Sequence, residues 1–263
     1  MKSLLRRFGR WLTVLAPLLL LVVLIGAWQL AADSGALADV LGLDSFLVPA
    51  PDEIATSLWD DRELLADNAW VTLVEVLAGF ALAVALGALM AAVLHLSPLL
   101  RRATYPLVVA SQTIPIIVIA PILVVWFGFG IGPKIGIVAL ICFFPVVVNA
   151  LDGLGTTAGE QRKLMRSLGA GPWRTFTVLE VPTALPYLFS GAKVAVAVAV
   201  IGAGPLAEDG ADSGLGHLIL LDNGQLEIAR VFASVVVLSV MAMVLFALLA
   251  LLERRVVWWS GDR

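Results

Sequence analysis

The sequence has little charge, and only one of its residues is a cysteine. Of its 263 residues, 14% are charged and 60% are hydrophobic. A soluble domain usually carries about 25% charged and about 45–50% apolar residues. This chain has more apolar surface than one soluble core can hide, so the composition excludes an ordinary soluble domain and indicates a lipid bilayer as its solvent.

The single cysteine, Cys142, lies within the apolar run "IVALICFFPVVV". One cysteine cannot form a disulfide within the chain, and this setting favours a packed, inert thiol over a metal ligand or a nucleophile.

Sequence motifs for catalysis and nucleotide binding are also missing. The chain contains no G-x-x-x-x-G-K-[ST] phosphate loop and no G-x-S-x-G elbow. The two histidines, His95 and His217, are far apart, and no group of His, Cys and carboxylate residues has the spacing of a metal site. The net charge of −3 gives no basis for nucleic-acid binding. We therefore expect no enzyme, no metal and no cofactor in the chain itself.

The sequence does have long apolar runs. A bilayer core of about 30 Å requires about 20 apolar residues in a helix. Six runs approach or reach this length, at approximately 11–32, 69–94, 105–129, 134–151, 187–207 and 228–252. They predict an all-α polytopic membrane protein with six transmembrane helices.

The basic residues lie mostly on one side of these predicted spans. This side holds 13 of the 17 lysines and arginines: Lys2, Arg6, Arg7, Arg10, Arg101, Arg102, Arg162, Lys163, Arg166, Arg174, Arg254, Arg255 and Arg263. Acidic residues concentrate in the loops on the other side. By the positive-inside rule, both termini and the loop 152–186 are cytoplasmic.

The predicted domains follow from these spans. They are a cytoplasmic tail at 1–10, a first transmembrane helix at 11–32, an outer loop at 33–68, a five-helix core at 69–252 that includes the cytoplasmic loop 152–186, and a cytoplasmic tail at 253–263. The first span is longer than the apolar region of a signal peptide, about 7–15 residues, which favours an uncleaved anchor over a signal peptide. The outer loop contains a predicted amphipathic helix on the membrane surface, with Asp52 as its N-cap; a docking surface for an external partner is the alternative.

The cytoplasmic loop carries an unusually polar stretch, "EQRKLMRSLGAGPWRTFTVLEVPTALPY". A helix is predicted up to Leu168, with Gly169 as its left-handed C-cap. Gly171 is expected to open a second helix with Pro172 at its first position. We expect Pro182 and Pro186 to stop this second helix. Such a rigid helix pair is suited to docking against another protein, and an interfacial pair resting on lipid headgroups is the alternative.

Polar and helix-bending residues at membrane depth form a second candidate site. They are Ser111, Gln112 and Pro115 in "SQTIP", and Pro145 and Asn149 in "FPVVVN". Kinked helices are tolerated where a cavity or neighbouring helices satisfy the freed backbone groups. The residues predict a translocation path, or hydrogen bonds between helices, or both. From the residues alone, an intramembrane enzyme using Glu75 and a scaffold without a path are further alternatives.

The loop also resembles a known signature. Gly169 is followed by nine residues and then by "LEVP", and this spacing is similar to the cytoplasmic loop of permease subunits of binding-protein-dependent ABC importers. The similarity runs from about residue 48 to the C-terminus through "LVPAPDEI", "TLVEVLAGF", "SQTIPIIVIAPILVVWFGFGIGPK", "CFFPVVVNALDGL" and "ADSGLGHLI". These segments resemble the nitrate/sulfonate/taurine branch, and most of all its permeases for pyrimidine precursors of thiamine.

The resemblance implies a type I ABC importer permease fold in the bacterial cytoplasmic (inner) membrane. It implies a homodimer with two ATPase subunits, which hold ATP and Mg, and with an external solute-binding protein. Its substrate would be a small organic solute such as a pyrimidine precursor, or alternatively a sulfonate, taurine or nitrate.

The resemblance also implies that the loop contacts the ATPase. The implied coupling residues are Glu160, Lys163, Leu164, Arg166, Ser167, Leu168, Gly169, Ala170, Gly171, Trp173, Phe176 and Pro182. The start of the signature departs from the family pattern, because the signature often begins Glu-Ala-Ala six residues before the glycine and this chain has Lys163-Leu164-Met165 there.

Overall fold

The computed structural model describes residues 2–128, 130–202 and 213–260, and all regular structure within them is helical. The all-α prediction is therefore confirmed for this part of the chain. The helices are α1 (Lys2–Asp33), α2 (Ala36–Leu41), η1 (Ser45–Leu47), α3 (Pro51–Asp60), α4 (Arg62–Leu96), α5 (Pro98–Ser111), α6 (Ile116–Phe127), α7 (Ile131–Gly155), α8 (Gly159–Ser167), α9 (Pro172–Thr175), η2 (Phe176–Glu180), α10 (Val181–Gly202), α11 (Leu215–Gln225), α12 (Ile228–Val256) and η4 (Trp258–Ser260).

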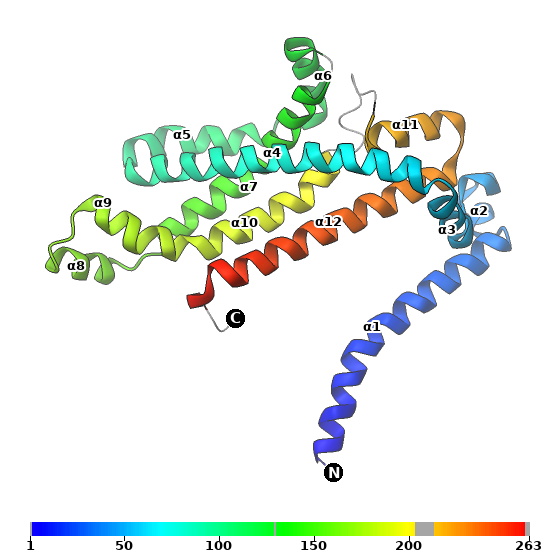
Figure 1. Ribbon diagram of the computed structural model, residues 1–263, viewed down its shortest axis with the longest axis horizontal. Helices are drawn as coiled ribbons and strands as arrows, with labels where there is room; N and C mark the ends of the chain where they lie inside the picture. Colours follow the sequence, from blue (N-terminus) through cyan, green and yellow to red (C-terminus); the bar gives the residue numbers. More distant parts are fainter. Residues whose placement is uncertain (1, 129, 203–212, 261–263) are drawn as a thin grey trace.

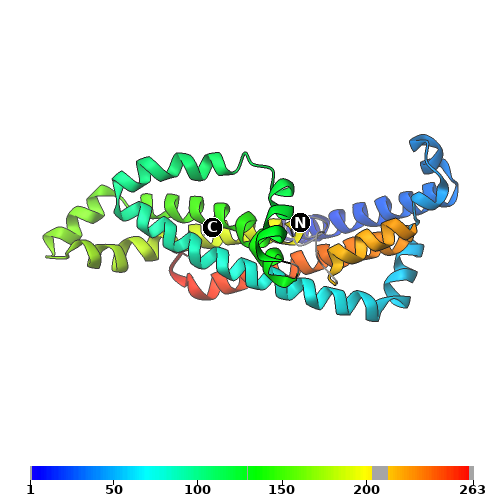
Figure 2. The ribbon, with the colours of Figure 1, turned by 90° about the horizontal axis from the view of Figure 1, so that it is seen from above.

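Helices α4, α7, α10 and α12 form the bundle at the centre of the molecule (Figures 1 and 2). Glycines of α4 bring it close to α7, because a Cβ atom on Gly79 would lie 2.6 Å from the Cβ of Val138 and one on Gly87 would lie 2.7 Å from the Cγ1 of Val146. Small residues allow this close approach between membrane helices. In the described residues, four helices are long and apolar enough to cross a membrane: Arg62–Leu96, Ile131–Gly155, Pro172–Val200 and Ile228–Val256.

The third predicted span, 105–129, is not one helix. It is divided into α5 and α6 by Gln112–Pro115, and α6 stands steeply across the direction of α4 (Figure 1). Pro115 disfavours helical geometry at the residue before it, and the Ala110 carbonyl accepts from both the hydroxyl and the amide of Thr113, at 2.7 Å and 3.0 Å. Two apolar helices, Leu19–Asp33 and Val118–Phe127, are shorter than the four candidate spans.

The first helix meets the other elements near its C-terminal end (Figure 1). Gln29 of α1 donates to the Asp52 carboxylate at 2.7 Å, and the Asp52 amide donates to the Gln29 side-chain oxygen at 3.1 Å. The prediction that Asp52 is the N-cap of α3 is therefore wrong. The N-cap is Ala50, with Pro51 at the first helical position, and the Ala50 amide donates to the Glu53 carboxylate at 3.1 Å.

The helix after Gly171 does not stop at the two prolines, contrary to the prediction. It continues from Pro172 through η2 into α10, so that Pro182 and Pro186 lie inside a long helix. The five residues before Val181 form a π-helical turn. Such a turn widens the helix locally and accommodates a proline that an ordinary α-helical interior would not. The part of the loop 152–186 from Pro172 onward is consequently in one helical line with a candidate membrane span.

Candidate functional site

The turn between α8 and α9 has a fixed geometry that its glycines make possible. Gly169 adopts φ +76°, in the left-handed region, and its amide donates to the Arg166 carbonyl at 2.9 Å. The Ala170 amide donates to the Met165 carbonyl, also at 2.9 Å. These bonds form a Schellman motif. Gly171 is the N-cap of α9, and Pro172 stands at its first position. Both local predictions for the loop are confirmed.

Helices α8 and α9 project beyond one end of the bundle (Figure 1), and three large apolar side chains of this region are exposed. Leu164, Leu168 and Trp173 are 60%, 72% and 69% exposed. We call these three residues the apolar tip. Phe176 differs, because it is buried with its ring 5.7 Å from that of Trp173 and 6.2 Å from that of His95. The apolar tip therefore adjoins a packed cluster of the aromatic rings of Trp173, Phe176 and His95.

The other expected coupling residues are mostly on the surface around the apolar tip. The exposed ones are Glu160, Lys163, Arg166, Ser167, Gly169 and Gly171, whereas Ala170 and Pro182 are half-buried. The apolar tip is thus surrounded by more basic than acidic side chains. This mixture of exposed apolar and basic groups is typical of a surface that binds another protein.

A carboxylate that the sequence analysis did not single out joins the loop to the bundle. Glu180 in η2 accepts a hydrogen bond from the Nε of Arg162 in α8 at 2.6 Å, and its other oxygen lies 2.9 Å from the Nε2 of His95 in α4. The Arg162 guanidinium also donates to the Leu154 carbonyl at the end of α7, at 3.4 Å. We call His95, Arg162 and Glu180 the brace.

The brace is largely shielded from water. The side chains of Glu180 and His95 are 9% and 11% exposed, and that of Arg162 is 32% exposed. Charge-assisted hydrogen bonds in such a setting are stronger than those at an open surface. Lys163, which occupies the position of the family glutamate, does not take part. One signal of the brace was present in the sequence, since Glu180 is an isolated acid between aliphatic residues of "TVLEVP".

The second candidate site is partly assembled by the break between α5 and α6. Ser111, Gln112 and Pro115 line one cavity of about 600 Å³. The cavity is completed by α6, α7 and α10, through Ile114, Ile116, Ile119, Leu140, Ile141, Phe143, Phe144, Val198 and Gly202. Its described lining is uncharged, with two phenylalanines and one amide.

Pro145 and Asn149 are not among the residues that line this cavity. The Asn149 amide donates to the Pro145 carbonyl at 2.8 Å, within α7. A Cβ atom on Gly191 of α10 would lie 2.7 Å from the Cβ of Asn149, so Asn149 stands in a close contact between α7 and α10. The structure thus brings three of the five predicted path residues together and places the other two in helix packing.

At the other end of the bundle, Glu75 of α4 is paired with Lys134 of α7. The Lys134 ammonium donates to the Glu75 carboxylate at 2.7 Å and to the Ser213 carbonyl at 2.8 Å, and both side chains are buried. The Leu215 amide donates to the Thr72 hydroxyl at 2.9 Å. These bonds attach the start of the segment "SGLGHLI" to α4 and α7. They give Glu75 a structural partner.

Comparison with known proteins identifies relatives along most of the chain. Residues 83–258 match the family described as binding-protein-dependent transport system inner membrane component. The formylaminopyrimidine transport permease protein ThiX of Halalkalibacterium halodurans is 35% identical over 93% of this chain and 96% of that protein. The riboflavin transport system permease protein RibX of Chloroflexus aurantiacus is 31% identical over 98% of this chain and 94% of that protein.

Two further similarities concern the branch and the fold. The taurine transport system permease protein TauC of Escherichia coli is 29% identical over 64% of this chain and 61% of that protein. A chain of the MetNI methionine ABC transporter, in an inward-facing conformation, superposes with a TM-score of 0.61 at 18% identity, over 76% of this chain and 98% of that chain. The second similarity concerns the fold alone.

Proposed function

Because the chain belongs to the family of inner membrane components of binding-protein-dependent transport systems, we propose that a separate ATPase drives it through the loop 160–186. The chain is the permease subunit of an ABC importer. The observation that carries the proposal is the apolar tip, which is held out from the bundle on a rigid, braced pair of helices. Each large apolar side chain that becomes buried stabilises a complex by about 1.5–3 kcal/mol.

The brace provides the route by which movement of the loop reaches the membrane spans. Through Glu180 and Arg162, the loop is attached to the cytoplasmic ends of α4 and α7, and η2 continues directly into α10. A force on the loop at Trp173 is therefore transmitted to α4, α7 and α10 together. In the proposed mechanism, closure of the ATPase pair draws the loops of two permease copies together and reorients the paired bundles.

The partners follow from the same mechanism. Two ATPase subunits hold ATP and Mg, a second copy of the chain completes the path, and an external solute-binding protein delivers the substrate to the end of the bundle opposite the loop. The absence of a phosphate loop from the sequence supports nucleotide binding in trans. The basic residues beside the apolar tip support cytoplasmic termini, and α1 together with α5–α6 would bring the number of spans to six.

For the substrate, we propose a small, uncharged, flat solute such as a pyrimidine precursor of thiamine. The relative named as a formylaminopyrimidine permease supports this class. Sulfonate or taurine is the second candidate, because relatives with those names also match. The cavity favours the pyrimidine precursor over a sulfonate or taurine, because a buried anion requires a positive partner. The described lining holds Gln112, Phe143 and Phe144 but no lysine or arginine.

A co-purification experiment tests the coupling role. The substitution Leu168→Asp places a charge in the apolar tip and should abolish capture of the cognate ATPase subunits and ATP-driven uptake into proteoliposomes. Val40→Asp is the matched control, because Val40 is also strongly exposed but lies in α2, at the other end of the bundle (Figure 1). Val40→Asp serves as the control for capture of the ATPase, and the native chain as the control for uptake. The proposal is wrong if Leu168→Asp captures the ATPase as well as Val40→Asp does and supports uptake as well as the native chain does.

A further inference from the structure

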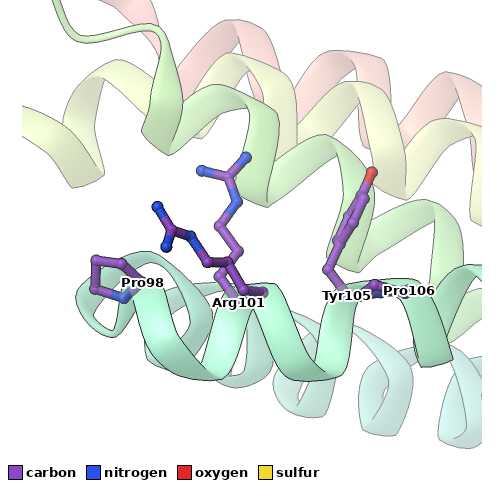
Figure 3. Close-up of a pocket in the computed structure, with 5 residues that line it drawn as sticks. Pro98, Arg101, Tyr105 and Pro106 are labelled. Atoms are coloured by element: carbon purple, nitrogen blue, oxygen red, sulfur yellow. The ribbon is translucent and has the colours of Figure 1, made fainter.

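The start of α5 carries two adjacent arginines beside a concave surface. Arg101 and Arg102 line a cavity of about 420 Å³ with Pro98, Tyr105 and Pro106, and the side chains of Arg101 and Tyr105 project from the same side of the helix (Figure 3). No carboxylate of the described residues lies within salt-bridge distance of either guanidinium. The proposed coupling mechanism makes no use of this cavity.

The position of the two arginines is unfavourable for the helix itself. The N-terminal end of a helix carries a partial positive charge that repels cations and falls off within the first turn. Here Ser97 caps α5, with its hydroxyl accepting from the Leu100 amide at 3.4 Å, and Arg101 and Arg102 are the fourth and fifth residues of the helix, at the edge of that turn. Their mutual repulsion adds to that of the helix dipole. An anion between the guanidiniums would relieve both effects, and the guanidinium fork matches the oxygens of a phosphate group.

The cavity has a buried side and an exposed side. Tyr105 is half-buried and packs against the bundle, whereas both arginines are exposed. Leu99, next to Pro98 on the same helix, is 79% exposed. The helix begins at the end of the bundle from which α8 and α9 project (Figure 1), the end that the charge distribution assigns to the cytoplasm. A group that places phosphate against the arginines and hydrocarbon against the exposed Leu99 fits this surface better than a small soluble ion does. Tyr105 adds a hydroxyl donor at the depth where membrane proteins commonly place tyrosine.

We propose that Arg101, Arg102 and Tyr105 bind the phosphate of an anionic phospholipid headgroup from the cytoplasmic leaflet. Basic pockets on this side of membrane proteins are suited to such headgroups. The bound lipid would hold the start of α5, whose other end carries the cavity residues Ser111 and Gln112. The site does not depend on the ATPase, so it can be tested whether or not the coupling mechanism holds.

The chain contains a matched control for the charge of this site. Arg254 and Arg255 are also adjacent and exposed, and they lie in the last turn of α12. The dipole stabilises cations at that end of a helix, and neither residue lines the cavity that contains Tyr105. If the headgroup responded only to positive charge at the membrane surface, both arginine pairs would contribute equally.

The test is native mass spectrometry of the purified full chain with added phosphatidylglycerol or phosphatidylcholine. We expect preferential binding of phosphatidylglycerol, which the variant R101Q/R102Q should weaken by at least about tenfold, since each lost charge-assisted bond weakens binding by about that factor. The control R254Q/R255Q should bind like the native chain. Y105F, which removes one hydroxyl and no charge, should weaken binding by a smaller factor.

Three results would overturn the proposal. The first is equal binding of the two lipids by the native chain. The second is an equal loss in the two arginine variants, which would reduce the site to general surface charge. The third is displacement of the lipid by excess inorganic phosphate, which would make free phosphate the ligand. A thermal unfolding midpoint of R101Q/R102Q equal to that of the native chain excludes misfolding as the cause, and Y105F carries the test if that midpoint falls.

Discussion

Substitution of Glu180 by glutamine should detach α8, the first helix of the loop 160–186, from the bundle while both remain folded. The carboxylate makes two contacts, at 2.6 Å with Arg162 and at 2.9 Å with His95. Glutamine has nearly the same shape but only one acceptor oxygen, so the change removes the negative charge and replaces one of the two acceptors by an NH2 donor. The residue lies inside a continuous helix, and glutamine is a good helix former. Loss of the helix is therefore not expected.

The size of the effect follows from the two contacts. A hydrogen bond to a charged group contributes about 1.5–3 kcal/mol, and a neutral one contributes about 0.5–1.5 kcal/mol. Because the Arg162 side chain is 32% exposed, water replaces part of what the carboxylate provided. We expect the brace to weaken by about 1.5 kcal/mol, which raises the population of detached loop about tenfold.

Limited proteolysis measures this population. Trypsin cleaves after lysine and arginine, and the loop offers Lys163 and Arg166 inside α8, where cleavage requires local opening. When opening and closing are fast, the cleavage rate follows the open population, so the rate for Glu180→Gln should rise about tenfold. Glu160→Gln is the matched control, since Glu160 is an exposed acid of the same helix outside the brace.

A double-mutant cycle separates the pair from other effects. If Glu180 and Arg162 interact, the cost of Glu180→Gln should be smaller when Arg162 is already glutamine, with a coupling free energy of about 1 kcal/mol. Equal cleavage of the Glu180→Gln and Glu160→Gln variants, or strict additivity with Arg162→Gln, would refute the brace as the joint between loop and bundle.

Three further predictions concern other parts of the molecule. Gly169→Pro should abolish capture of the ATPase, because proline cannot adopt φ +76° and lacks the amide that donates to the Arg166 carbonyl. Retained capture would show that the Schellman turn is dispensable. The control is Gly159→Ala, where the added Cβ would meet open space. Glu75→Ala should lower the free energy of unfolding by about 3–5 kcal/mol in thermal denaturation, because it leaves the Lys134 ammonium buried without a counter-charge. The double variant Glu75→Leu with Lys134→Met should recover most of this loss. An unaffected Glu75→Ala variant would contradict the reasoning. The hydrogen bond from Gln29 holds the pKa of the Asp52 carboxyl below its usual 3.8, so the bond should persist on acidification and be lost as the pH falls through the lowered pKa; a change in the distance between spin labels on α1 and α3 already at about pH 6, well above the usual pKa of aspartate, would contradict this assignment.

The features that were predicted correctly from the sequence are those that depend on residues adjacent in the chain. Gly169 and Gly171 specify their turn through local backbone geometry, so their roles were readable without the fold. The break at Pro115 also had a local signal, but the apolar composition on both sides of it favoured one continuous span. The prediction for Pro182 was wrong in the opposite sense, because the helix was expected to stop there and instead continues. A π-helical turn before it accommodates the proline, and no residue pattern predicts such a turn.

The ion pairs could not be predicted, because their partners are distant in the sequence. Glu180 and His95 are 85 positions apart, and Glu75 and Lys134 are 59 apart. Periodicity and charge bias place each residue near a span end but do not indicate which side chain lies opposite. The same limit applies to the predicted path, where three residues share a cavity through the break after α5 and Asn149 instead lies against Gly191.

The contact between α4 and α7 determines which parts of this transporter can move. Gly79, Ala83 and Gly87 are buried at successive turns of α4. A slide of α4 by one turn would put the methyl group of Ala83 where a Cβ lies 2.6 Å from Val138, a distance that atoms in a packed core do not tolerate. The two helices are thus confined to a single register. A reorientation of the bundle would therefore carry α4 and α7 as one body, without sliding between them.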